Sequence, residues 1–438
     1  MRSCQEAEEY ILSIPKFAGK HTLEDTRRLL ARVGGDGIKG KIIHVAGTNG
    51  KGSVCAYLRS VLLESGCSAG MFISPHLETM RERICIGNEM ISPDEFLRIF
   101  HRVREAVRQE GQDKENHPSF FEFLFLMAMA YFGEKQPDYL ILETGMGGRL
   151  DATNCLLKKD LCVITEIGYD HMQYLGDTLG EIAGEKAGIM RPGVPAVFVD
   201  KRSESTRVLS DYAKKMESPA IIVGKNNILN VNINHKTIDF SLYTGYYKYV
   251  SLSLETIALY QPENASLAVA AAEQLKDERI SEDTIRKGLQ RASWPGRMEE
   301  VMPGVYLDGA HNEDGIEMLL ATVKSRKCAG KRFLLFGVLE DKHYEEMIGL
   351  ITQSALFHEA AVTAIDEKRS LSLAKEKEVW NRYREKTDSS MALSFHENAR
   401  SAFGQLLAKK ESGDMVYIAG SLYLIGQIKS FLRRIQND

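Results

Sequence analysis

The stretch HVAGTNGKGS, residues His44–Ser53, stands between a short apolar run, Lys41–Ala46, and a periodic segment, Lys51–Ser65, that Gly66 ends. Glycines allow the backbone of such a loop to curl, so that several N–H groups converge on one point. The positive end of the following helix adds to the attraction for an anion. The stretch therefore predicts a strand–loop–helix unit with a phosphate-binding loop at its centre.

Consecutive residues of this loop are candidates for contact with a nucleotide triphosphate: Gly47, Thr48, Asn49, Gly50, Lys51, Gly52 and Ser53. Lys51 is placed to reach the β- and γ-phosphates, and the Ser53 hydroxyl to ligate magnesium. The strict pattern G-x-x-x-x-G-K-[ST] is not met, because its first glycine falls on Val45 and Gly52 occupies the Ser/Thr position. The alternative is a glycine-rich turn without a ligand, but a lysine directly after the glycines has no packing purpose.

Strand and helix signals alternate after this loop, which favours a mostly parallel sheet covered by helices. Between residues 227 and 260, polar and apolar residues alternate instead, which indicates a small antiparallel patch appended to the parallel sheet. Four short apolar runs predict further strands of the parallel sheet, at Tyr139–Leu142, Leu161–Thr165, Ala196–Val199 and Ala220–Val223. Helices are expected at Thr178–Met190, Glu263–Leu275 and Ser281–Ala292.

The segment Trp294–Arg297 (WPGR) interrupts the helical pattern, since Pro and Gly break it. We place a domain boundary here, so that residues 1–295 form the phosphate-loop domain and residues 296–438 a smaller Rossmann-like α/β domain. In the second domain the strands are expected at Val305–Leu307, Phe333–Phe336, Ala360–Thr363 and Met415–Ile418. Its helices are expected at Gly315–Lys324, Tyr344–Thr352 and Glu397–Lys410. The fold class is α/β.

Composition excludes several classes of protein. The hydrophobic fraction of 44% is that of a globular chain, and the net charge of −4 gives no reason to expect a nucleic-acid or membrane partner. The seven cysteines contain no C-x-x-C pair, so we expect neither a zinc site nor disulfides, and a cytoplasmic protein. No signal peptide is indicated. The most apolar run, Phe120–Phe132, is too short to span a membrane and predicts a buried helix. We expect a monomer.

The loop variant GTNGKGS resembles that of the folylpolyglutamate and dihydrofolate synthases, whereas the related cell-wall Mur ligases usually read GTNGKT. Other stretches resemble the same family in the same order along nearly the whole chain: SPHL (74–77), ERI (82–84), ETGMGGRLDATN (143–154), ITEIGYDHMQYLG (164–176), GEKAGIM (184–190), PGR (295–297), DGAHN (308–312), FGVLEDK (336–342) and GSLYLIG (420–426). The resemblance implies an ATP-dependent ligase that adds L-glutamate to a folate through an acyl phosphate. The folate is tetrahydrofolate with its γ-linked glutamates, dihydropteroate, or both.

Two other functions compete with this one. A different Mur-type ligase, acting on a UDP-sugar peptide, is expected to carry a UDP-binding domain ahead of the loop, and the residues before Gly47 are too few for one. A P-loop switch protein that reads guanine is expected to carry an N-K-x-D motif, which the sequence lacks. ADP release that depends on both glutamate and a folate separates a ligase from a switch.

The resemblance implies that Mg²⁺ is held by Ser74, Glu143 and His171. Glu143 ends the apolar run YLILE, at the edge of a parallel sheet where ligands bind. Without the resemblance, a solvated carboxylate and a structural histidine are the simpler interpretations. Lys186 lies in a helix of mixed polarity, where a surface lysine is the plain expectation. The resemblance makes it instead a lysine that CO₂ carbamylates, which yields an anion able to orient magnesium.

The resemblance also places the active site in a cleft between the two domains. Arg297 and Asp308 are expected to contact ATP, with Asn264 on the adenine side. His311 and Ser421 are expected near the phosphate or the incoming glutamate. From the residues alone, a helix-capping aspartate and a turn histidine are the alternatives for Asp308 and His311. Two further residues, in the stretch PSFFEFLF, are expected to line the pterin pocket: Phe121 and Glu122.

Overall fold

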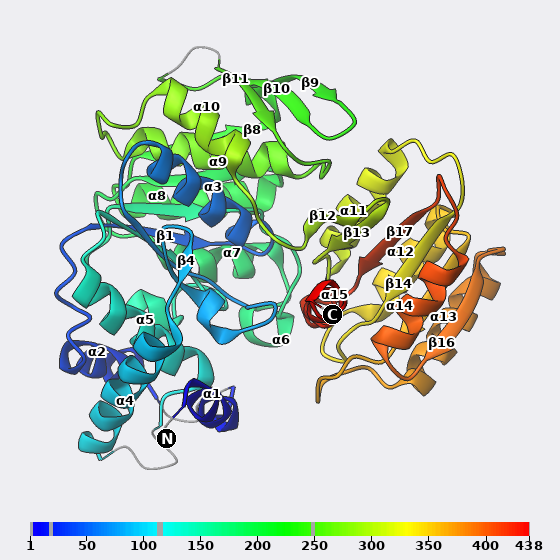
Figure 1. Ribbon diagram of the computed structural model, residues 1–438. Coiled ribbons are helices and arrows are strands. Elements are labelled where there is room, and N and C mark those ends of the chain that lie inside the picture. The colour runs from blue at the N-terminus through cyan, green and yellow to red at the C-terminus, as the bar shows by residue number, and fades with distance from the viewer. Residues whose placement is uncertain (1–2, 17–20, 112–116, 247–249, 438) are drawn as a thin grey trace.

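The computed structural model describes residues 3–16, 21–111, 117–246 and 250–437. Figure 1 shows two α/β domains side by side, the larger formed by the N-terminal two-thirds of the chain. The expected fold class is confirmed: a mostly parallel sheet with an antiparallel patch is followed by a smaller α/β domain. Among the described residues, no helix is long and apolar enough to cross a membrane.

The larger domain is built on an eight-stranded sheet in the order β4-β3-β2-β5-β1-β6-β7-β8. The strands from β2 across to β8 run parallel, and β3 and β4 extend one edge as antiparallel strands. The four predicted strands each end within one residue of their expected bounds. The bounds are β1 Lys41–Ala46, β2 Ala69–Phe72, β3 Ile84–Ile86, β4 Glu89–Met90, β5 Tyr139–Glu143, β6 Leu161–Ile164, β7 Ala196–Asp200 and β8 Ala220–Gly224.

Helices cover both faces of this sheet, because alternate residues of a strand point to opposite faces. Ile42 and Leu140 pack with α1, α2, α4 and α5, whereas Ile43 and Ile141 pack with α3, α9 and α10. On the first of these faces, α7 and α8 cover β6 and β7. The apolar run predicted as a buried helix is α5. The bounds are α1 Cys4–Ser13, α2 Leu23–Arg32, α3 Lys51–Glu64, α4 Pro93–Gln109, α5 Phe120–Lys135, α6 Met172–Leu175, α7 Leu179–Ala187, α8 Ser203–Lys215, α9 Gln261–Gln274 and α10 Glu282–Arg291.

The predicted antiparallel patch is present, but it forms a separate sheet instead of extending the parallel one. Its strands are β9 Ile228–Ile233, β10 Ile238–Leu242 and β11 Val250–Leu254, in the order β11-β10-β9. Alternate residues of β10 and β11 are buried, and Phe240 and Leu252 join the core around α3. The reason for the separation is packing: the strands of this sheet contact α9 and α10, and β8 remains the edge strand of the parallel sheet.

The smaller domain has a six-stranded sheet in the order β12-β13-β17-β14-β15-β16, in which only β12 is antiparallel to its neighbour. The domain boundary at 295/296 stays a prediction; β12 begins at Arg297. The strands are β12 Arg297–Met302, β13 Val305–Asp308, β14 Arg332–Phe336, β15 Glu359–Thr363, β16 Ala392–His396 and β17 Met415–Ala419. The helices are α11 Glu313–Ser325, α12 Tyr344–Ser354, α13 Leu373–Lys386, α14 Ala399–Lys409 and α15 Leu422–Asn437.

Candidate active site

The phosphate loop leaves β1 and enters α3, as predicted. Gly50 is the N-cap of α3 with φ of 88°, and a Cβ at this position would lie 2.3 Å from the side-chain oxygen of Asn264. No described side chain caps this helix start, so the first N–H groups of α3 stay available to an anion. Lys51 folds back over the loop, where its Nζ donates to the carbonyls of Gly47 at 3.1 Å and Thr48 at 3.0 Å. A phosphate entering here therefore meets both a cation and free backbone donors.

Lys186 reaches the same loop from α7. Only 3% of the residue is exposed, and its Nζ donates to the Gly47 carbonyl at 2.8 Å. Burial, and then the positive charge of Lys51, lower the pKa of Lys186 to about 7. The expectation of a surface lysine is therefore wrong, because α7 turns this side chain inward. At neutral pH a large share of Lys186 is a free amine, which is the nucleophilic form.

Glu143 stands beside the loop because β5 pairs with β1 in a register that sets it opposite Val45. The carboxylate is buried, and its Oε2 accepts a hydrogen bond from the backbone N–H of Ser74 at 3.0 Å. Burial raises the pKa of Glu143, although the Lys51 charge opposes this shift. Within the described part of the chain, no lysine or arginine nitrogen lies within ion-pair distance of it. A buried carboxylate without a cationic partner is costly, and a bound cation would offset that cost.

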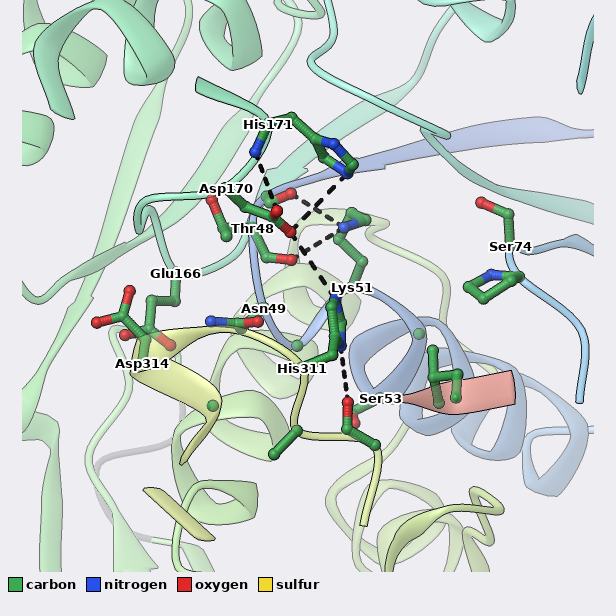
Figure 2. Close-up of a pocket in the computed structure, with 18 of the residues that line it drawn as sticks. Thr48, Asn49, Lys51, Ser53, Ser74, Glu166, Asp170, His171, His311 and Asp314 are labelled. Carbon is green, nitrogen blue, oxygen red and sulfur yellow. Dashed lines mark hydrogen bonds and ion pairs between the residues drawn. The ribbon is translucent and has the colours of Figure 1, made fainter. Parts of the chain in front are cut away.

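A cluster around Asp170 joins the two domains. Asp170 Oδ1 accepts from Lys342 Nζ at 2.7 Å, and its Oδ2 lies 3.8 Å from His311 Nε2 and 3.9 Å from His171 Nε2. Figure 2 shows Asp170 and His171 facing His311, with Lys51 next to them. Burial lowers the pKa of each histidine to about 4, so both are neutral at physiological pH. Burial raises the pKa of Asp170, but Lys342 and the two histidines outweigh it and hold that pKa well below its usual range.

The smaller domain contributes a second wall. The β12–β13 register sets Arg297 opposite Asp308 at the start of the sheet. Asp308 is buried, and both of its carboxylate oxygens accept hydrogen bonds. Oδ2 accepts from the Tyr260 hydroxyl at 2.6 Å and from the Met298 N–H at 3.0 Å, and Oδ1 accepts from the Ala310 N–H at 2.9 Å. Burial raises its pKa, opposed by Arg297. Asp308 is therefore not a helix cap, as the alternative had it; the N-cap of α11 is Asn312.

These side chains line a pocket between the two domains. It is lined by every residue predicted for the site except Phe121 and Glu122: Gly47, Thr48, Asn49, Gly50, Lys51, Gly52, Ser53, Ser74, Glu143, His171, Lys186, Asn264, Arg297, Asp308, His311 and Ser421. The lining also includes residues that the sequence-based prediction missed: Glu166, Asp170, Tyr260, Asp314, Lys342 and Arg369. Asp170 and Lys342 lie inside two of the stretches that carry the family resemblance, ITEIGYDHMQYLG and FGVLEDK, which was the available signal.

Phe121 and Glu122 lie outside this lining for a local reason. Glu122 belongs to the first turn of α5, where its carboxylate accepts from the Ser119 N–H at 2.6 Å as part of a capping box and lies 3.3 Å from His21 Nδ1. The Phe121 ring packs against Phe72, 5.4 Å between centroids, on the side of Gly145. Both residues therefore have structural contacts, and their role toward a substrate stays a prediction.

Two protein-family models match the chain. Residues 45–272 match the Mur ligase middle domain, and residues 296–422 match the Mur ligase glutamate ligase domain. The chain is 37% identical to the dihydrofolate synthase/folylpolyglutamate synthase of Bacillus subtilis over 98% of its own length and 99% of that protein's. The chain belongs to the folylpolyglutamate and dihydrofolate synthase group of the Mur ligase family.

Solved structures place this Mur ligase in the same group. The folylpolyglutamate synthase of Mycobacterium tuberculosis complexed with ADP is similar with a TM-score of 0.88 at 26% identity, covering 98% of each chain. E. coli FolC in complex with DHPP and ADP gives a TM-score of 0.84 at 26% identity, covering 99% of this chain and 98% of that one. The similarity therefore extends over both domains of the Mur ligase, including the pocket between them.

Proposed function

We propose that this chain is an ATP-dependent ligase that adds L-glutamate to folates. The observation that carries the proposal is the pocket in which the phosphate loop, Glu143 and Lys186 meet Arg297 and His311 from the other domain. The B. subtilis relative is named both a dihydrofolate synthase and a folylpolyglutamate synthase, so both dihydropteroate and tetrahydrofolate are proposed substrates. ATP is the proposed nucleotide, supported by relatives solved with ADP.

The reaction needs activation because a carboxylate is a poor electrophile. The terminal carboxylate oxygen of the folate bonds to the γ-phosphorus of ATP as the bond to the bridging oxygen breaks, and ADP leaves. The amine of L-glutamate then attacks the acyl carbon, loses a proton, and phosphate departs. Lys51 and the N–H groups of α3 bind the phosphoryl oxygens, so they stabilise the charge that moves between them. The buried pocket limits access of water to the acyl phosphate.

Magnesium fits the donors that this chain provides. Glu143 is a buried carboxylate without a cationic partner, Ser74 adjoins it, and His171 is neutral and thus able to donate a lone pair. We propose that these residues hold Mg²⁺, with Ser53 on the nucleotide side and Lys186, as a carbamate, oriented toward it. When bound, the ion would supply positive charge to the phosphates. The Ser53 hydroxyl already accepts from Gln261 Nε2 at 3.3 Å, so it would exchange this partner on ligation.

Glu143→Gln should separate metal binding from folding. Because burial raises the pKa of Glu143, ionising this carboxyl costs stability: the loss grows as pH rises from the ordinary carboxyl value through the raised pKa and stays constant above it. The neutral amide keeps an acceptor for the Ser74 N–H, so the ligand-free variant should unfold about 2 °C higher at neutral pH. Activity should fall about tenfold or more at low magnesium. Thermal unfolding without ligand, together with a magnesium titration of activity, tests both halves. An unchanged titration curve would leave Glu143 with a structural role only.

The second domain should hold part of the nucleotide. Arg297→Ala removes a cation from the pocket wall, and Asp308→Asn replaces a buried carboxylate while keeping an acceptor for Tyr260. Losing one hydrogen bond to a charged group costs about tenfold or more in affinity, so each variant should raise the KM for ATP by that factor. Initial rates at varied ATP, with saturating folate and glutamate, provide the measurement. A KM for ATP that does not move would remove both residues from the nucleotide site.

One assay tests the function as a whole. The protein is incubated with ATP, L-glutamate and either dihydropteroate or tetrahydrofolate, and the products are read by mass spectrometry. We expect ADP release that depends on both glutamate and the folate, and a product heavier by one glutamate residue. ADP release that depends on neither would point to the switch protein instead. A product from only one of the two substrates would show that the protein has only the corresponding activity.

A further inference from the structure

Trp294 makes an unusual contact between the link that joins the two domains and the phosphate loop. It stands three residues after α10 and directly before Pro295. A Cβ built on Gly52 would lie 2.7 Å from Cζ2 of the indole and 3.0 Å from its Cε2 and Nε1. Real Cβ atoms essentially never approach another atom so closely, so the indole occupies the space of a side chain at position 52. The ring thus packs directly on the first turn of α3.

This contact explains why the loop departs from the strict P-loop pattern. Gly52 occupies the position where that pattern has Ser or Thr. A threonine there would need its Cβ and two further heavy atoms in the volume that the indole fills. An indole is rigid and cannot fold aside as a long flexible side chain can. Glycine at 52 and tryptophan at 294 are therefore a matched pair, the one making room for the other.

The same short segment also reaches the opposite wall of the active site. The carbonyl of Gly296 accepts from the Gly309 N–H at 2.7 Å and from Arg297 Nη1 at 3.1 Å, which fixes the segment to the start of the second domain. Ser53, Trp294 and Arg297 line one common cavity. Trp294, which contacts the first turn of α3, therefore lies only three residues before Arg297, which lines the nucleotide pocket.

We propose that Trp294 is a positioning residue: its indole, seated on Gly52, fixes the first turn of α3 relative to Arg297, so that phosphate binding and placement of the second domain's wall are coupled. The proposal rests on the proposed nucleotide site. Trp294 is not part of the lining of the pocket that holds the phosphate loop, and it acts there through Gly52, which is part of that lining. The competing interpretation is plain core packing, since Trp294 also packs at the edge of the core around α3, α9 and α10.

A double-mutant cycle on nucleotide affinity distinguishes the two interpretations. ADP binding is measured by calorimetry for the full chain and for Gly52→Ala, Trp294→Phe and the double variant. Gly52→Ala should weaken ADP binding about tenfold, because the new methyl group pushes the indole or the helix turn aside. In the Trp294→Phe background, where the ring is smaller, the same change should weaken binding less than twofold. Gly404→Ala, at a helical glycine of α14 with nothing within 4 Å of the added Cβ, is the matched control and should change nothing.

The outcomes separate this inference from the function it rests on. Failure of the unaltered protein to bind ADP would overturn the nucleotide site and with it both proposals. ADP binding by the unaltered protein with additive effects of the two variants would overturn only the role of Trp294. Thermal unfolding of all four proteins is measured in parallel, since core packing alone would lower the midpoint without this non-additivity in affinity. KM for ATP should follow the ADP affinities, whereas kcat at saturating ATP should change less.

A fluorescence measurement needs no change at Trp294. The chain has two tryptophans, and the second, Trp380, is buried against Phe336 in the smaller domain. Trp380→Phe leaves Trp294 as the sole indole emitter. Saturating ADP should then change the intensity or wavelength of its emission, and Gly52→Ala should abolish or alter that change. Emission that stays constant on ADP binding, in a variant shown by calorimetry to bind it, would overturn the coupling.

Discussion

Lys51→Ala is expected to lower kcat by about 10²-fold or more, the loss typical of removing one preorganised stabilising group. The Nζ of Lys51 lies over the loop, held at 3.1 Å and 3.0 Å by the carbonyls of Gly47 and Thr48. Its charge is therefore already in place before the phosphoryl group moves, and no other residue of the loop carries a charge. Single-turnover rates with saturating ATP, folate and glutamate measure the effect on the chemical step.

Two controls make the Lys51 result interpretable. Thermal unfolding checks that the variant folds, which we expect because the hydrogen bonds of this lysine to described residues go to carbonyls of its own loop. Lys158→Ala removes a lysine that also donates to two backbone carbonyls, those of Lys39 and Gly40, but is exposed and outside the pocket. That control should keep its activity. Near-normal turnover of Lys51→Ala would show that ATP binds elsewhere.

Lys186→Ala is expected to remove most of the activity, because we predict that Lys186 is carbamylated in the active enzyme. The ammonium first loses a proton; the free amine then attacks CO₂, a nitrogen–carbon bond forms as one carbon–oxygen π bond opens, and a second proton leaves, so a cation becomes an anion. With the pKa of Lys186 lowered to about 7, the amine fraction rises as pH rises through that value. Activity should accordingly increase with bicarbonate and from pH 6 to pH 8. Lys186→Glu should recover part of the activity and Lys186→Arg none.

The chain contains an internal control for this modification. Burial also lowers the pKa of Lys159 to about 7, but its Nζ donates to the Ile189 carbonyl at 3.0 Å and to the Asn154 side chain, and it lies outside the pocket. Chemical trapping of CO₂ followed by mass spectrometry should therefore label Lys186 and leave Lys159 unlabelled. Equal labelling would mean that a lowered pKa alone decides the modification. A plain ammonium on Lys186 in fully active protein would defeat the prediction.

The sequence predicted those parts of the fold whose signal is local. Runs such as Tyr139–Leu142 are short, apolar and bounded by polar or glycine residues, so their strands ended within a residue of expectation. The strand Ala69–Phe72 was missed because AGMF has neither β-branched residues nor alternation, and it is defined by pairing with β5. The edge strands Ile84–Ile86 and Glu89–Met90 are too short to leave a pattern. The separate antiparallel sheet depends on packing against α9 and α10, which no local pattern encodes.

The residues of the site likewise fall into those that the sequence could predict and those that it could not. Loop residues and the strand-end Glu143 could be named because β–loop–α order and a parallel sheet bring them to one edge. The ion pair between Asp170 and Lys342 joins residues 172 positions apart, so only a tertiary structure brings them together. The sequence did not predict that Lys186 is buried, because the mixed polarity of α7 is typical of a surface helix. In the structure its side chain donates to the carbonyl of Gly47.

The packing of α3 sets the order in which the chain can mature during synthesis. Its apolar side is covered by α9 and α10, and Ser60 Oγ donates to the Gly288 carbonyl at 2.6 Å across 228 positions of sequence. A ribosome adding about 5–20 residues per second needs on the order of tens of seconds to travel that distance. Through this interval the nascent helix exposes Val54, Leu58 and Val61 to solvent or to a chaperone. The proposed nucleotide site therefore cannot form until at least two-thirds of the polypeptide has been released from the exit tunnel.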